Sequence, residues 1–96
     1  MATYISLLRF TQQGITDIKK APARLDAAKD AYRRAGGELK AFYLTMGQYD
    51  AVVIGEVPDD AAAARLTLQI GSLGNVRTET LKAFPEAEYR KIVGSL

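Results

Sequence analysis

Tyr49 and Asp50 are the residues of this chain best suited to chemistry, because a phenol and a carboxylate stand side by side. They follow Gly47 at a turn that enters an apolar strand. The pair could bind and orient a polar ligand, or move a proton if Asp50 were buried. The alternative is structural, since Asp closes turns with its side chain and Tyr can pack under a hairpin. We expect Gly47 and Asp50 to shape the hairpin and Tyr49 to be the residue that touches a ligand.

A second group of candidate ligand-binding residues follows the first expected strand. They are Thr11, Gln12, Lys20 and Arg24. These side chains could line one side of a cleft between helices and a sheet. Lys20 and Arg24 lie four residues apart and could share a helical face that grips an anion. The alternative is that they are surface residues paired with Asp17 and Asp26.

Three polar residues in the last third of the chain form another group: Asn75, Arg77 and Glu79. We expect Asn75 to end a helix rather than to contact a ligand. Arg77 and Glu79 share one face of a strand and could form a salt bridge between two copies of the chain as easily as a site. Interface or folding roles are therefore predicted for them.

The composition narrows the chemistry further. The 96 residues include no Cys and no His, and Trp is also absent. Disulfides and thiolate metal sites are excluded, and the commonest general base and metal ligand near neutral pH is missing. Thirteen Lys and Arg against eleven Asp and Glu give a net charge of +2. This excess is small, whereas nucleic-acid-binding proteins usually concentrate basic charge on one face. We expect no cofactor, metal or nucleic-acid partner, and we assign no catalytic residue.

Length and hydropathy predict a single domain over residues 1–96. No stretch approaches the roughly 18–20 apolar residues that span a bilayer, and the N-terminus lacks the features of a signal peptide. A cytoplasmic location without a membrane partner is expected.

Four segments have the composition of β-strands: residues 3–10, 38–44, 51–57 and 76–84. The first and third are apolar on both faces, which is typical of central strands. The second and fourth carry more charge, as edge strands do. In the second strand, strict alternation puts Leu39, Ala41 and Tyr43 on one face and Lys40, Phe42 and Leu44 on the other.

Helical periodicity fills the intervals between these strands. We expect a short turn at 15–20, then a helix from Pro22 that Gly36-Gly37 ends. A second helix begins at Asp59 as N-cap and closes at Gly74-Asn75. Gly71 is unfavourable inside that helix unless a strand approaches closely. Pro85 opens a terminal helix over 86–93.

Two similar strand–helix–strand halves predict an α+β fold, a ferredoxin-like βαββαβ sandwich. It has a four-stranded antiparallel sheet with two helices on one face plus a C-terminal helix. Two helices cover only one face, and the first and third strands place Leu, Ile or Val on the other whichever way they turn. We therefore expect a homodimer or higher homo-oligomer that packs through the sheet face.

The chain resembles the GYD-domain family, named for a Gly-Tyr-Asp motif that stands here as Gly47-Gln48-Tyr49-Asp50. The resemblance also rests on Thr11 to Gly14, Lys20 to Arg24, Gly36-Gly37, Pro58 to Asp60 and the long run from Gly71 to Leu81. It implies a bacterial ferredoxin-like domain, similar to dimeric α/β-barrel proteins, with no established activity. Antibiotic-biosynthesis and haem-degrading monooxygenases share that architecture. The haem-degrading branch relies on His and Trp, which this chain lacks.

Three functions stay open at this point. The first is a small-molecule binding or sensing module for a polar or anionic ligand, in a helix–sheet cleft near Tyr49. The second is a structural or assembly subunit. The third is a cofactor-free enzyme of the monooxygenase or isomerase kind, with Asp50 or Tyr49 as base. A cleft filled by side chains would contradict the first, and an Asp50 used only to shape the hairpin would weaken the third.

Overall fold

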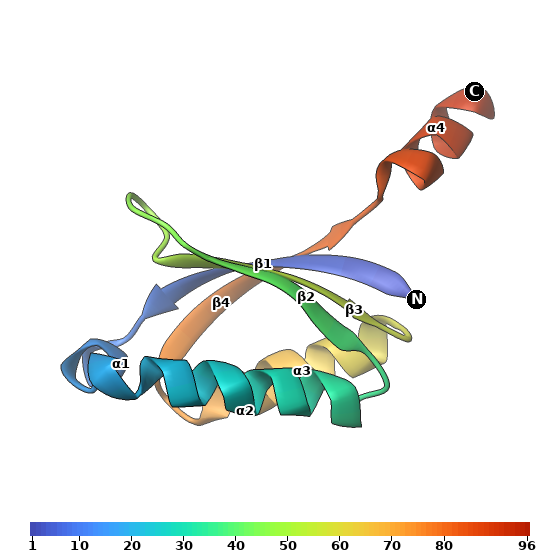
Figure 1. Ribbon diagram of the computed structural model, residues 1–96. Helices are drawn as coiled ribbons and strands as arrows, with labels where there is room; N and C mark the ends of the chain where they lie inside the picture. The colour runs from blue at the N-terminus through green and yellow to red at the C-terminus, as the bar shows by residue number, and fades with distance from the viewer.

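The computed structural model describes residues 1–96 as an α+β fold built on one four-stranded antiparallel sheet (Figure 1). The strands are β1 (Ala2–Phe10), β2 (Glu38–Leu44), β3 (Ala51–Val57) and β4 (Val76–Ala83). Their order in the sheet is β2-β3-β1-β4, and every neighbouring pair is antiparallel. The two apolar strands β1 and β3 are therefore central and the two charged strands are edges, which confirms the prediction.

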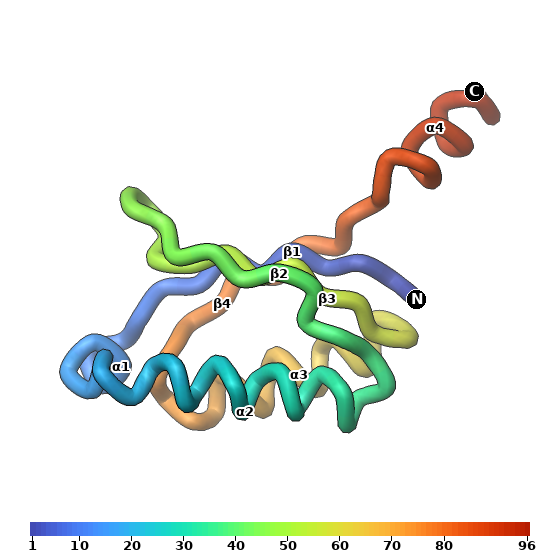
Figure 2. The backbone as a smooth tube through the Cα atoms, viewed as in Figure 1, coloured from blue at the N-terminus to red at the C-terminus, as the bar shows by residue number.

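The helices are α1 (Gln12–Thr16), the 3₁₀ turn η1 (Ile18–Lys20), α2 (Ala21–Arg34), α3 (Asp60–Ser72) and α4 (Glu86–Gly94). Figure 2 shows α2 and α3 side by side under one face of the sheet. Pro22 lies in the first turn of α2, as predicted. Helical structure begins earlier than the turn expected at 15–20, because the Thr11 side chain accepts the N–H of Gly14 and caps α1.

The ends of the elements follow the expected turn chemistry. Asp59 caps α3 by accepting a 2.8 Å hydrogen bond from the N–H of Ala62. Gly36 (φ 85°) and Gly47 (φ 130°) adopt the left-handed backbone that side chains disfavour. The explanation expected for Gly71 is wrong, since a side chain there would meet nothing within 4 Å. No helix is both long and apolar enough to cross a membrane.

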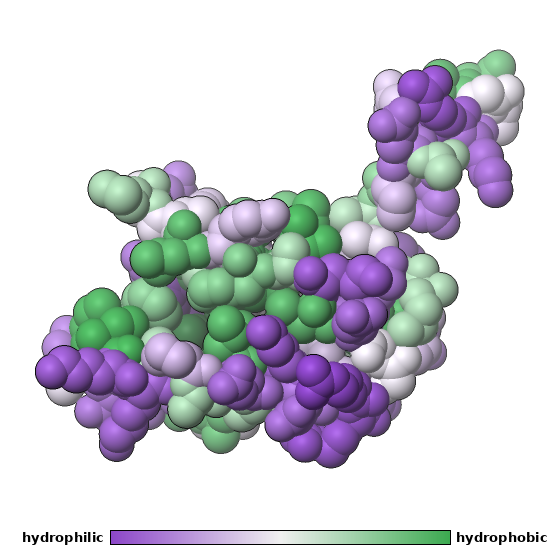
Figure 3. Space-filling view, viewed as in Figure 1, coloured by the Kyte–Doolittle hydropathy of each residue, from purple (hydrophilic) through white to green (hydrophobic).

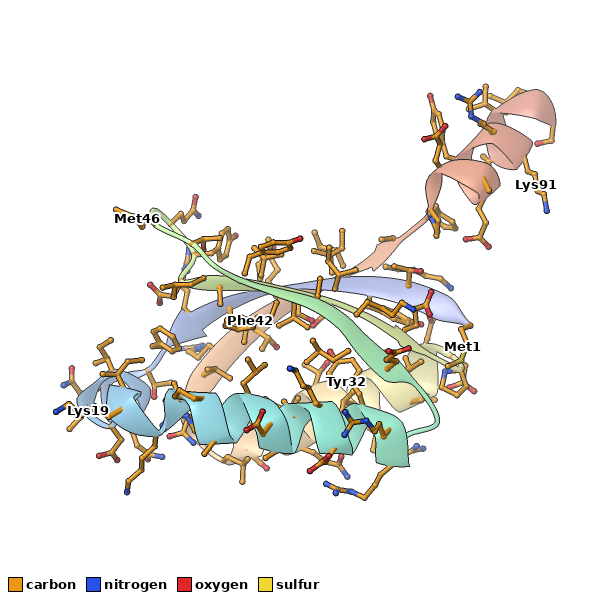
Figure 4. All side chains as sticks on the ribbon, viewed as in Figure 1. Met1, Lys19, Tyr32, Phe42, Met46 and Lys91 are labelled. Carbon is orange, nitrogen blue, oxygen red and sulfur yellow. The ribbon has the colours of Figure 1, made fainter.

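The pairing of β2 with β3 is irregular, and this corrects the predicted alternation. The register shifts between Leu39 and Ala41, so one extra residue is accommodated on β2. As a result Leu39 lies on the helix side together with Phe42 and Leu44, rather than with Ala41 and Tyr43. Figure 4 shows Phe42 in the layer between the sheet and the helices.

The core between the sheet and the helices is small. Eleven of the 96 residues are buried, which is few for a chain that has to stabilise two layers. Seven of the buried residues form the hydrophobic core: Tyr4, Tyr32, Val53, Val57, Ala62, Ala63 and Leu66. Tyr32 reaches from α2 toward the sheet (Figure 4) and packs against the backbone of Gly55. Much of the space between the layers is thus left to partly buried side chains.

The other face of the sheet has no helix packed over it, and we call it the open face (Figure 1). Its centre is apolar because Ile5 pairs with Ile54, and Leu7 pairs with Val52. Leu81 and Tyr43 extend the patch onto the edge strands, where they are 46% and 60% exposed. The prediction that one face keeps Ile, Leu and Val uncovered is confirmed.

Helix α4 stands apart from the rest of the molecule. It leaves the end of β4 and projects away from the sheet, on the side opposite α2 and α3 (Figures 1 and 2). Every residue of α4 is exposed. The chain therefore ends in an arm that its own body does not cover.

Candidate functional site

Tyr49 lies over the open face of the sheet. Its hydroxyl donates a 2.6 Å hydrogen bond to Oε2 of Glu79 on β4. The guanidinium carbon of Arg9 sits 4.8 Å from the centre of the Tyr49 ring, and Arg9 Nε donates to the carbonyl of Gln48 at 3.0 Å. A cation at this distance over an aromatic face is attracted by the ring. The structure thus places Tyr49 on the opposite side of the sheet from the cleft in which it was expected.

The electrostatics of this cluster keep the phenol protonated. The hydrogen bond to Glu79 raises the pKa of Tyr49, desolvation and the Glu79 charge add to the rise, and Arg9 partly offsets it. A phenol with a raised pKa donates a hydrogen bond at neutral pH and does not act as a base. The contacts of Arg9 with Gln48 and Tyr49 hold the hairpin against β1, and the bond from Tyr49 to Glu79 holds it against β4.

Asp50 serves the backbone. Its Oδ2 accepts a 2.9 Å hydrogen bond from the N–H of Phe10, and its own N–H donates to the carbonyl of Leu8 at 2.8 Å. The N–H of Thr45 donates to the Asp50 carbonyl at 2.9 Å and so closes the hairpin loop. Asp50 consequently fastens the hairpin to the end of β1, a structural role in which its side chain reaches the neighbouring strand rather than its own turn.

The loop after β1 is tied to the end of α3. The Thr11 hydroxyl donates to the carbonyl of Gly74 at 2.6 Å, and the Thr11 N–H donates to the carbonyl of Asn75 at 3.1 Å. Gly14 packs so closely there that an added Cβ would lie 2.0 Å from the Asn75 carbonyl oxygen. Gln12 hydrogen-bonds within α1, to Thr16 at 3.3 Å. Thr11 and Gln12 thus satisfy local backbone and side-chain groups.

Arg24 and Lys20 are not brought together as a pair of free cations. Arg24 Nη2 donates to the carbonyl of Gly14 at 3.1 Å, and Nη1 donates to the carbonyl of Asp17 at 3.3 Å. Lys20 ends the turn η1 and is exposed. Of the six candidate residues, Arg24 alone lines the space between the helices and the sheet.

That space is an apolar cavity of about 870 Å³. Its walls come from the helix side of the sheet, with Ser6, Leu8 and Val53 among them, and from α2 and α3. Figure 3 shows apolar surface gathered over the gap between β2 and α2, with hydrophilic surface on the outer side of α2. A cavity of this size is far larger than the small voids of a close-packed interior. It lies within the range of small-molecule sites.

The charged side chains among the lining residues are all arginines: Arg24, Arg34 and Arg65. Arg34 ends α2, and Arg65 lies on α3 three residues after the buried Ala62. Sequence analysis identified neither, because the helix stripes were traced through apolar residues alone. The i, i+3 spacing of Arg65 from Ala62 is the signal that was available.

A second polar cluster anchors the start of α3. The Tyr4 hydroxyl donates to Asp60, and Lys82 Nζ lies 3.2 Å from Asp60 Oδ1. The bond to Asp60 and burial raise the pKa of Tyr4 to about 12, and the bonds from Tyr4 and Lys82 lower the pKa of Asp60. The sequence carried no local signal for this contact, because Tyr4 and Asp60 lie 56 residues apart. No group of three acidic side chains converges as a metal site.

Three comparisons place the chain among known proteins. Its sequence matches the GYD domain over residues 4–93. It is 36% identical over 89 residues to the "Glutamine synthetase and cystathionine beta-lyase binding protein" of Thermus thermophilus, covering 92% of this chain and 94% of that protein. The crystal structure of TTHA0845 from the same organism is similar with a TM-score of 0.56 and 29% identity, over 88% of this chain and 94% of that one. The chain therefore belongs to the GYD-domain family.

Proposed function

We propose that this protein is a small-molecule binding module whose site is the cavity between the sheet and helices α2 and α3. The observation that carries the proposal is the apolar cavity of about 870 Å³. The space opens to solvent on one side, so its apolar walls stay in contact with water, and a natural occupant that buries them would add stability. The site differs from the one expected near Tyr49, since Tyr49 lies across the sheet.

The lining defines the class of ligand. Twenty of the 29 lining residues are hydrophobic, and the charged ones carry a guanidinium. Arg24 already donates to two carbonyls, whereas Arg34 and Arg65 make no ion pair in the structure. A guanidinium prefers carboxylate or phosphate. The ligand we propose is an apolar molecule with one anionic group, which narrows the polar or anionic ligand expected from the sequence.

Decanoate, a ten-carbon carboxylate, is the probe for this proposal. We expect it to shift the backbone amide NMR signals of residues that line the cavity, Leu8 and Val53 among them. The variant Ala28→Trp puts a large ring into the cavity and abolishes these shifts. The matched control Ala23→Trp changes an exposed position of α2 outside the lining and keeps them. Unchanged lining signals in the wild type, with decanoate in excess, would contradict the proposal.

A second candidate function is association with other proteins through the open face. The uncovered patch around Ile5, Leu7, Val52 and Ile54 supports it, because apolar areas of this kind mark interaction surfaces. The Thermus relative is named as a protein that binds two enzymes, which agrees with a protein partner for this family. We propose a second copy of the chain as the first occupant of this face, in a C2 dimer with sheet against sheet.

We also propose that the fold belongs to the ferredoxin-like class, which the strand order β2-β3-β1-β4 with helices on one face supports. A cytoplasmic location stays a prediction. The enzyme hypothesis is not favoured, because Asp50 is engaged with the Phe10 N–H and Tyr49 with Glu79.

A further inference from the structure

Helix α4 carries one apolar stripe. Tyr89, Ile92 and Val93 follow one another at helical spacing and are 58%, 46% and 48% exposed. Leu96 continues the stripe beyond the last turn and is 98% exposed. An isolated helix shorter than about 12–15 residues is marginal in water. A helix of nine residues with this stripe therefore needs a surface to pack against.

Arg77, on the open face at the beginning of β4, is a charged residue without a partner. Arg77 stands directly opposite Arg9 in the β1–β4 ladder, and like charges in that position repel. Arg9 is engaged with Tyr49 and Gln48. Arg77 makes no ion pair in the structure. A carboxylate from outside the chain would relieve this repulsion.

Helix α4 carries such a carboxylate. Glu88 borders the apolar stripe and makes no ion pair, whereas Glu86 is engaged with Arg90 at 2.8 Å. The chain's own Glu88 cannot reach Arg77, because β4 carries the chain about 20 Å from Arg77 to Ala83 before α4 turns away from the sheet. The carboxylate that meets Arg77 would have to belong to another molecule.

We propose that α4 is an arm that docks onto a second copy of this chain, with its apolar stripe on the partner and Glu88 paired with Arg77. The inference rests on the sheet-to-sheet association proposed above. A twofold axis lying in the interface, perpendicular to the strands, places the end of each β4 over the beginning of the other. Each arm then reaches the Arg9–Arg77 end of its partner, and the exchange is reciprocal.

The apolar part of the contact is tested by analytical ultracentrifugation of the full chain. Ile92→Ser removes a member of the stripe, and Lys91→Ser is the matched control on the opposite side of the same helix. We expect a wild-type dimer whose dissociation constant rises about tenfold in Ile92→Ser and stays unchanged in Lys91→Ser. A dimer that Ile92→Ser leaves intact overturns the arm and leaves sheet pairing standing. A monomeric wild type overturns both.

The charged part is tested by exchanging the two charges. Arg77→Glu and Glu88→Arg should each weaken the dimer about tenfold, because each puts like charges together. The double variant Arg77→Glu/Glu88→Arg restores the opposite pair and should recover most of the affinity. Additive losses in the double variant overturn the pairing of Glu88 with Arg77. Circular dichroism of each variant separates weakened pairing from loss of fold.

Discussion

The hydroxyl of Tyr49 donates a 2.6 Å hydrogen bond to Glu79 across the open face of the sheet. The bond joins the loop before β3 to the edge strand β4, which are separated by the whole of β1. The tyrosine of the family motif is thereby part of the surface that faces away from the helices. The cavity proposed to bind a ligand and the motif are on opposite sides of the sheet.

Tyr49→Phe should therefore leave ligand binding unchanged. The substitution removes the bond to Glu79 but alters nothing in the cavity lining. Titration of decanoate into wild type and variant, followed by the NMR shifts of the lining residues, measures the effect. Loss of binding in Tyr49→Phe would move the ligand to the open face and contradict the proposed site.

Asp50→Ala should destabilise the fold by about 1–2 kcal/mol, because the Phe10 N–H loses its acceptor in a partly buried place. Asp50→Asn keeps a side-chain oxygen at that position and should cost less than half as much. Urea unfolding of the two variants measures the difference. Equal losses in both would show that the negative charge, and not the hydrogen bond, is what the fold requires.

Arg65→Gln should weaken decanoate binding and leave decanol binding unchanged. The guanidinium is expected to meet the carboxylate, while the alkyl chain occupies the apolar walls. A loss of about tenfold or more corresponds to one hydrogen bond to a charged group. Arg33→Gln is the control, since Arg33 precedes the lining residue Arg34 and pairs instead with Asp30 at 2.6 Å. Equal losses of affinity for decanoate and decanol would show that Arg65 does not recognise the carboxylate.

Stability should fall at both extremes of pH through the contact between Tyr4 and Asp60. The pKa of Tyr4 rises from 10.0 to about 12 in the fold, so between these values the unfolded chain releases a proton that the folded chain keeps. That contribution is complete below pH 10 and is lost as the pH rises toward 12. The pKa of Asp60 is lowered, so its contribution is present above its ordinary pKa of 3.8 and is lost as the pH falls.

Tyr4→Phe tests this linkage. It should lower stability near neutral pH by about 1 kcal/mol and make both the acid and the alkaline decline shallower. Thermal unfolding of wild type and Tyr4→Phe from pH 3 to about pH 11 gives the comparison. Parallel pH profiles for the two proteins would mean that other groups cause the declines.

Leu7→Lys should dissociate the proposed sheet-to-sheet dimer. Leu7 lies at the centre of the open face, opposite Val52, and a buried unpaired ammonium in a sheet-to-sheet interface is costly. The control Leu68→Lys changes an equally apolar residue that is 73% exposed on α3. Light scattering should report a monomer for Leu7→Lys and the wild-type mass for Leu68→Lys. The same mass for all three proteins would exclude the open face as the interface.

The order of the strands was predictable because hydrophobic patterning is local and strong. Val52, Val53 and Ile54 leave no polar face, which requires neighbours on both edges, and the structure has them. Caps and turns at Asp59, Gly36 and Gly47 were predictable for the same reason, since each depends on a few adjacent residues. The register of β2 was not, because its shift is decided by the pairing with β3.

The candidate site was predicted less well, because a site depends on contacts between distant segments. The alternation of β1 puts Arg9 and Phe10 on opposite faces of the sheet. The sequence around Tyr49 does not show on which of these faces its ring lies, and so whether it contacts Arg9 or Phe10. The cavity arises from how far the helices stand from the sheet, a distance that no sequence pattern encodes. Asp50 was expected to shape the hairpin, and its bond to Phe10 extends that role to the neighbouring strand.

Ser6 and Leu7 are adjacent in β1, yet Ser6 lines the cavity and Leu7 belongs to the open face. A deletion or insertion of one residue in β1 would exchange the two sets of side chains along its length. It would put the side chains that now face the helices on the open face and those of the open face toward the helices, which would disturb both the proposed ligand site and the proposed interface. The central strand should thus tolerate a change of length far less well than a conservative substitution at one position.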